Sequence, residues 1–232
     1  MDIKLFVVTI IAFIIFTTTI TAGEKEDPSW DQVVRAASLI SNNSQSVINL
    51  LSVAKNDINI NKEHSSFNKE ALKRFEKKNT YYDFLEENTE KEEIPFAVFK
   101  TTMMGYGLMS YFDWKDISNS AEMTGVLNNM LNTLNIKKLT KDEITNINTK
   151  VNSKLVEPYT FKKQFLATNM MITTVGSIVK KRNYRVLWYI DISDSYSFFL
   201  VTPQVYEQLN NTQLGEDQEF KEPKFTLDGD LE

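Results

Sequence analysis

Apolar residues recur at steps of three and four positions over residues 29–55, which is the spacing of one face of an α-helix. Pro28 suits the first helical turn, because the N–H that it lacks would have no partner there. Asp27 or Ser29 can cap the helix, and Gln32 follows Ser29 at the spacing of a capping box. We therefore expect one helix over residues 29–55, with a buried face made of Val33, Ala37, Ile40, Val47, Leu51 and Ala54.

Residues 56–93 are highly charged and hold few apolar positions. A helix that faces solvent needs only a few apolar contacts, so we expect one or two such helices here. A mobile acidic link over residues 86–93 should follow them. The apolar anchors of these helices are Phe67, Leu72, Phe75, Tyr81, Phe84 and Leu85.

The apolar side chains at positions 94, 96 and 98 alternate with their neighbours, as at the start of a β-strand. An apolar run follows over residues 103–114. Gly105 and Gly107 within this run disfavour a stable helix and suit a strand or a tight bend. We therefore expect extended chain in this region.

Two amphipathic helices are predicted within residues 119–156. Thr140 and Glu143 have the spacing of a capping box at the start of the second helix, and Pro158 ends it. The apolar face of the first helix is Met123, Val126, Leu127, Met130, Leu131 and Leu134; that of the second is Ile144, Ile147, Val151 and Leu155.

Beyond Pro158 the pattern changes to that of strands. Residues 164–179 are rich in threonine, isoleucine, valine and methionine with no polar face, which is typical of a strand that is buried on both sides. Residues 184–192 and 196–202 alternate on either side of a turn, as in a hairpin. We expect three adjacent antiparallel strands, with Trp188 buried between the sheet and a helix.

Helices and antiparallel strands that come in runs are typical of α+β proteins. A sheet that is apolar on both faces needs a cover on both. We therefore expect a three-layer α/β/α fold, in which amphipathic helices cover both faces of a mostly antiparallel sheet. Residues 23–206 should form this single domain.

The first residues have the three-part layout of a signal peptide. Met1–Lys4 is a short charged start, residues 5–16 form an apolar run, and a small polar stretch leads to Ala22. The run is too short to span a bilayer as a helix, which favours a signal peptide over residues 1–22 against a retained membrane anchor. We expect a secreted, extracellular protein. Because the chain has no cysteine, a hydrophobic core must stabilise it without disulfides.

The acidic charge is concentrated near the end of the chain. Residues 215–232 hold seven acids and two lysines, so they contribute 2 − 7 = −5, which equals the formal net charge of the whole chain. The rest of the chain is close to neutral, which argues against nucleic-acid binding, since that needs a concentrated basic face. We expect residues 207–232 to form an acidic, flexible tail.

The sequence holds no recognisable catalytic, cofactor-binding or metal-binding constellation. His64 is the only histidine, and its polar surroundings favour a solvated surface residue over a general base. Asp191 and Asp194 flank a turn, where aspartates commonly bond to their own backbone. Nucleophile, phosphate-loop and zinc-helix motifs are absent from the sequence. We expect a protein that is not an enzyme, with no cofactor and no metal.

Two sequons could carry N-linked glycans if the protein is secreted. Their acceptor residues are Asn42, before Asn43-Ser44, and Asn210, before Asn211-Thr212. Such motifs also arise by chance in a chain this rich in asparagine.

Three stretches resemble the Cyt-type cytolysins, which comprise the bacterial cytolytic δ-endotoxins and the volvatoxin-like mushroom toxins. Residues 27–37 (DPSWDQVVRAA) resemble the first helix of that family and its lead-in. The helical pair within residues 123–155 resembles the two packed helices before the main strands of the family. Residues 184–190 (YRVLWYI) and 197–203 (SFFLVTP) resemble a late pair of adjacent strands.

This resemblance implies a three-layer fold and a membrane-damaging activity. Members of the family are trimmed by proteases at their termini, and their helices are thought to swing off the sheet so that strands enter lipid. It implies a lipid membrane as the partner and oligomerisation on membranes. The residues expected to contact lipid are Phe165, Met171, Ile172, Val175, Trp188, Tyr189, Phe198 and Phe199.

A second interpretation carries similar weight. Aromatic and β-branched strands more often form a folded core than a lipid-inserting device. The chain is then a secreted, non-enzymatic effector or binding protein that acts on a host protein.

Overall fold

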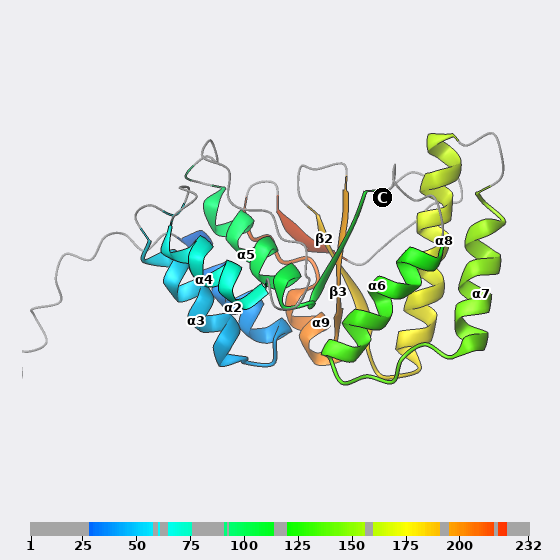
Figure 1. Ribbon diagram of the computed structural model, residues 1–232, viewed down its shortest axis with the longest axis horizontal. Helices are drawn as coiled ribbons and strands as arrows, with labels where there is room; N and C mark the ends of the chain where they lie inside the picture. The colour runs from blue at the N-terminus through cyan, green and yellow to red at the C-terminus, as the bar shows by residue number, and fades with distance from the viewer. Residues whose placement is uncertain are drawn as a thin grey trace, which may run out of the picture.

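The structure, a computed structural model, has three layers with a β-sheet in the middle (Figure 1). It describes residues 28–57, 60, 65–75, 91, 93–113, 120–155, 160–190, 195–215 and 218–221. In this part of the chain, eight helices and one four-stranded sheet give an α+β fold. The elements in order are α2 (Pro28–Ile40), α3 (Gln45–Lys55), α4 (Ser66–Phe75), α5 (Ile94–Gly105), β1 (Met109–Asp113), α6 (Ser120–Thr133), α7 (Lys141–Asn152), α8 (Phe161–Lys180), β2 (Arg185–Ile190), β3 (Ser195–Val201), α9 (Pro203–Leu209) and β4 (Glu219–Lys221).

The sheet has the strand order β1-β3-β2-β4, and every neighbouring pair is antiparallel. Phe198 in β3 lies opposite Trp188 in β2 on one side and opposite Ser110 in β1 on the other. Side chains directly opposite one another point to the same face of a sheet, and neighbours along a strand point to opposite faces. This register therefore divides the residues of β2 and β3 between two faces.

Each face of the sheet has its own hydrophobic core. Leu187, Tyr189, Phe199, Val201 and Phe220 pack with α2–α5 and α9, which we call the N-terminal layer. On the opposite face, Val186, Trp188, Phe198 and Leu200 pack with α6–α8, which we call the C-terminal layer. The predicted three-layer arrangement, with helices on both faces of an antiparallel sheet, is therefore confirmed (Figure 1).

An aromatic cluster anchors the N-terminal layer to the sheet. The ring of Phe99 in α5 lies 5.6 Å from that of Tyr189, 5.8 Å from that of Phe199 and 6.1 Å from that of Phe220. Tilted and edge-on rings at these separations attract one another in addition to burying apolar area.

Several local predictions are also confirmed. The hairpin predicted over residues 184–192 and 196–202 is formed by β2 and β3. The two amphipathic helices predicted within residues 119–156 are α6 and α7, and Thr140 and Glu143 form the capping box of α7. Trp188 is buried, with 3% of its surface exposed.

The strand predicted over residues 164–179 is wrong, because these residues lie in helix α8. Their apolar positions recur with a helical period, which the abundance of β-branched side chains obscures. The hydroxyls of Thr168 and Thr174 donate to the carbonyls of Gln164 and Met170, four residues earlier, at 3.0 and 2.7 Å. These bonds give the threonine hydroxyls a hydrogen-bond acceptor within the helix, so threonine is tolerated there.

The strand start predicted at residues 94–98 is also wrong, because these residues open helix α5, with Pro95 in its first turn. Gly105 ends this helix instead of serving a strand. A Cβ on Gly105 would lie 2.4 Å from the ring of Phe75, so α4 and α5 approach closely only because this position is glycine. Gly107 has a φ of 68° and makes the turn into β1, where the extended chain begins.

The single helix predicted over residues 29–55 is two helices, α2 and α3. Asn42 and Asn43 separate them with φ values of 53° and 58°. Asparagine tolerates this left-handed conformation better than most residues, so the pair reverses the chain and lets α3 pack beside α2.

The acidic tail predicted over residues 207–232 is partly ordered. Residues 207–209 lie in α9, and β4 pairs with β2 at the edge of the sheet. Phe220 is fully buried in the N-terminal core. The backbone N–H of Asn211 donates to the Phe220 carbonyl at 2.7 Å, and the Phe220 N–H donates to the Thr212 carbonyl at 2.9 Å. The domain therefore extends to Lys221, beyond the predicted boundary at residue 206.

Other predictions fall outside the described residues. These are the signal peptide at residues 1–22, the acidic link at 86–93 except Lys91 and Glu93, and the tail beyond Lys221. His64, Tyr81, Phe84, Leu85, Asp191 and Asp194 are likewise outside.

Trp188→Ala should lower the free energy of unfolding by about 3–5 kcal/mol, because it leaves a cavity between the sheet and the C-terminal layer. Leu72→Ala is the control, since Leu72 is 39% exposed, and it should change stability by about 0.5 kcal/mol or less. Urea denaturation followed by circular dichroism measures both. Equal midpoints for Trp188→Ala and the wild type would contradict the burial of Trp188.

Candidate functional site

The residues predicted to contact lipid are buried and divided between the two cores. Met171, Ile172, Val175, Trp188 and Phe198 lie in the core of the C-terminal layer. Tyr189 and Phe199 lie in the other core, on the opposite face of the sheet. The side chain of Phe165 is outside the described set. In this conformation the structure therefore brings together five of the eight candidates, and all five face inward.

Helix α8 is the longest helix in the described part of the chain, and it is amphipathic. Thr173 and Ser177 are exposed on its outer face. From Phe161 to Ile190 the sequence contains no acidic residue, and lysines lie at both ends of the helix. A helix that has an apolar face, and whose charged residues are all cationic, is typical of segments that lie in a membrane interface. None of the described helices combines the length and apolarity needed to cross a membrane.

The buried apolar positions of α8 are Ala167, Met171, Ile172, Val175, Ile178 and Val179.

Charge is unevenly distributed along the sequence. Residues 120–190, which comprise α6, α7, α8 and β2, hold eleven lysines and arginines and four acids, so their net charge is 11 − 4 = +7. The rest of the chain holds 26 − 11 = 15 basic and 31 − 4 = 27 acidic residues, a net charge of −12. The sum over residues 1–214 is close to zero and hides this difference, whereas a sum over residues 120–190 reveals it.

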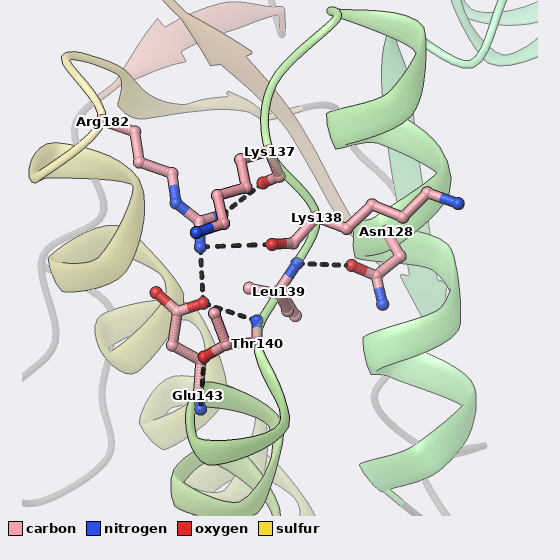
Figure 2. Close-up of polar contacts among 7 residues, drawn as sticks. All are labelled: Asn128, Lys137, Lys138, Leu139, Thr140, Glu143 and Arg182. Atoms are coloured by element: carbon pink, nitrogen blue, oxygen red, sulfur yellow. Dashed lines mark hydrogen bonds and ion pairs between the residues drawn. The ribbon is translucent and has the colours of Figure 1, made fainter.

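Arg182, in the turn between α8 and β2, holds three segments of the C-terminal layer together (Figure 2). Its guanidinium donates to the carbonyl of Lys137 at 2.8 Å and to that of Lys138 at 3.5 Å. It also forms an ion pair with Glu143 Oε2 at 2.5 Å. The side chains of Arg182 and Glu143 are only 14% and 27% exposed, so water screens this pair less than a surface pair.

Glu143 also caps α7. Its Oε2 accepts from the backbone N–H of Thr140 at 2.8 Å, and Thr140 Oγ1 accepts from the N–H of Glu143 at 3.2 Å. Asn128 in α6 accepts from the N–H of Leu139 at 2.8 Å, which ties the same loop to the preceding helix (Figure 2). One carboxylate therefore joins the start of α7 to the end of α8.

These bonds gather cationic side chains that are distant in the sequence. We call Lys137, Lys138, Lys141, Lys180, Lys181 and Arg182 the basic end of the C-terminal layer. The five lysines are exposed, and the side chain of Lys138 extends away from the bonded groups (Figure 2). With Asp142 and Glu143 beside them, the local net charge is 6 − 2 = +4. The sequence patterns did not predict this cluster.

The two sequons differ in their surroundings. Asn42 is exposed in the turn between α2 and α3, where a glycan would meet solvent. Asn210 follows α9, and its Oδ1 is buried without a hydrogen-bond partner. A glycan therefore fits the folded structure at Asn42.

No group of three or more histidine, cysteine, aspartate or glutamate residues is placed to hold a metal ion among the residues that the structure describes.

Glu143→Gln should show that the Arg182–Glu143 pair stabilises the layer. Burial raises the pKa of Glu143, but the bond from the Thr140 N–H and the charge of Arg182 outweigh it, so the pKa lies below its usual value. A carboxyl with a lowered pKa stabilises the fold above its unfolded pKa of about 4.3 and loses this contribution as the pH falls further. The variant should therefore be about 1–2 kcal/mol less stable at pH 7, and this difference should shrink below about pH 4.

Asp142→Asn is the matched control, because Asp142 is the neighbouring carboxylate and is exposed. Thermal unfolding at several pH values measures both variants. A Glu143→Gln difference that is the same at pH 3 and pH 7 would contradict the role of the ion pair.

Comparison with curated proteins and with solved structures gives no match. A family model described as "Domain of unknown function (DUF6630)" matches residues 47–217, which begin within α3, leave out α2, and include α4–α9 and β1–β3. This description assigns no activity, so the resemblance to Cyt-type cytolysins stays a hypothesis. Since the match covers more than half of the chain, the protein belongs to the DUF6630 family.

Proposed function

We propose that this is a secreted, membrane-active protein of the cytolysin type, which binds anionic lipid surfaces through its C-terminal layer. One observation carries the proposal. Residues 120–190, which comprise this layer, the segments that connect its helices and strand β2, combine a net charge of +7 with an amphipathic helix, α8, whose sequence contains no acidic residue.

Charge supplies the first contact with the membrane. A lysine or arginine near an anionic lipid surface contributes about 1 kcal/mol of attraction, which falls off within a Debye length. The lysines of the basic end belong to this layer, where the fold brings them together. An anionic surface therefore orients the protein with its C-terminal layer toward the lipid.

Apolar contact with lipid requires a change in the structure. Among the described residues, Leu72 is the only large apolar side chain that is exposed, and it belongs to the other layer. The apolar face of α8, together with Trp188 and Phe198, is covered by the C-terminal layer packing on the sheet. Insertion therefore requires this layer to separate from the sheet, after which α8 can lie in the interface with its apolar face in lipid.

The division into two cores favours such a separation. If the C-terminal layer leaves, the core on the other face of the sheet keeps all its residues. The two layers meet at the end of α6, where Leu134 packs against both cores and Thr133 lies beside Gly107. This contact is the place to test whether separation is required.

A second candidate function is a secreted, non-enzymatic binding protein. The burial of the apolar candidates and the exposure of the lysines at the basic end favour it, because these lysines can equally bind an acidic protein. Such a protein would not permeabilise lipid.

A disulfide between the layers tests the membrane-active function. A Cβ on Gly107 would lie 3.9 Å from the Cβ of Thr133, close to the mean of about 3.8 Å in disulfides. The natural chain has no cysteine, so the double variant Gly107→Cys/Thr133→Cys can form only this intramolecular bridge. Oxidised, it should bind vesicles of anionic phospholipid but release no trapped dye. Reduction should restore the release.

Gly107→Cys alone is the control, because it carries the strain of a side chain at a φ of 68° but no bridge. It should release dye whether oxidised or reduced. Equal leakage from the oxidised and reduced double variant would show that the layers need not separate at this contact. A wild-type protein that never releases dye, even with residues 222–232 removed, would leave the binding protein as the better account.

A further inference from the structure

We infer that the basic end of the C-terminal layer is a docking surface for lipid headgroups that carry phosphomonoesters. This inference rests on the proposed function and names the headgroup that its membrane would present.

The basic end is arranged by the fold in advance. Lys137 and Lys138 precede α7, and Lys180 and Lys181 come from the end of α8, about forty residues later in the chain. Arg182 holds the two pairs together through the carbonyls of Lys137 and Lys138. Because these bonds involve the backbone, the ammonium groups of the lysines stay available for a ligand.

The lysines and the arginine therefore have different roles. The guanidinium of Arg182 is occupied by two carbonyls and by Glu143, so it positions the surface and does not itself receive the ligand. The five lysines are exposed, and each ammonium is a compact charge with three donors on a flexible stem. Such a group binds a phosphate oxygen from many directions.

The charge of the ligand decides among anionic lipids. A phosphomonoester carries about −1.5 to −2 charges at neutral pH, against one for the phosphodiester of an ordinary phospholipid. Attraction to a cluster of several lysines rises in proportion to the charge on each headgroup. The acids beside the cluster are Asp142 and Glu143, and Glu143 is already paired, so the surface keeps a net charge of +4 toward the ligand.

The shape of the surface favours a headgroup over a free phosphate compound. The lysines lie on the loop before α7, on the first residue of α7, on the last residue of α8 and on the turn after it, and all are exposed at one end of the layer. Five exposed side chains spread over three segments can engage several headgroups in one plane. The amphipathic helix α8 belongs to the same layer, so docking here brings it close to the lipid.

Flotation with vesicles of matched surface charge tests the inference. One set contains phosphatidic acid in phosphatidylcholine, and the other contains enough phosphatidylserine to give the same zeta potential. The wild type should bind the phosphatidic acid vesicles at least about fivefold more tightly. The additional charge on the phosphomonoester adds about as much attraction as one further lysine would, which is about 1 kcal/mol. Lys137→Gln/Lys181→Gln should bind them about 25-fold more weakly and lose the preference.

Lys69→Gln/Lys73→Gln is the matched control. Both residues are exposed lysines on α4 of the N-terminal layer, so the change in net charge is the same. This variant should keep both the affinity and the preference of the wild type.

Each other outcome overturns a defined part of the account. Equal binding to the two vesicle sets would overturn the phosphomonoester inference and leave the membrane-active function standing. No binding to either set would overturn both. Release from the vesicles by inorganic phosphate at concentrations that leave the zeta potential unchanged would show that the ligand is a free phosphate compound instead of a lipid. Equal weakening by the α4 control would show that the basic end is not the docking surface.

Discussion

The structure depends on the burial of strands β2 and β3 from both sides. In β2, Val186 and Trp188 point into one core, and Leu187 and Tyr189 point into the other. In β3, Phe198 and Leu200 point into the same core as Trp188, and Phe199 and Val201 point into the core on the other face. Neither face of this pair can meet water without exposing aromatic area, so the fold needs a helical layer on each face. The two layers, the two cores and the position of β4 at the edge follow from this requirement.

In each helical layer, one arginine joins segments that are distant in the sequence. In the N-terminal layer, Arg74 pairs with Glu70 at 2.7 Å and donates to the hydroxyl of Tyr106 at 3.0 Å. That hydroxyl donates to the carbonyl of Ser46 at 3.1 Å, so α3, α4 and the end of α5 are joined. Arg182 does the same for the C-terminal layer. Polar bonds are directional, whereas apolar packing between a layer and the sheet is not. The proposed function requires the C-terminal layer, joined in this way, to move as one body.

The sequence predicts those parts of the fold that depend on short-range patterns. Strict alternation identifies β2 and β3, and the spacing of Thr140 and Glu143 identifies the start of α7. The patterns fail where another signal competes with them. Threonine and valine in α8 suggest a strand, although the hydroxyls of Thr168 and Thr174 are satisfied within the helix. Asn42-Asn43 is a recognisable turn signal that the apolar period of residues 29–55 obscures.

The candidate site is less accessible to sequence analysis, because it depends on a contact between distant segments. Arg182 and Glu143 are 39 residues apart, and no pattern in the sequence pairs them. The cationic excess of residues 120–190 could be found from the sequence, but only by summing the charge over that range instead of over the whole chain.

The central claim is that the C-terminal layer leaves the sheet at an anionic membrane while the N-terminal layer stays folded. Hydrogen exchange read by mass spectrometry, with and without anionic vesicles, tests it most directly, because exchange reports the opening of each segment separately. The account predicts that vesicles change the exchange of peptides from α6–α8 and leave those from α2 and α3 unchanged. An equal change in both layers, or no change in either, would contradict it.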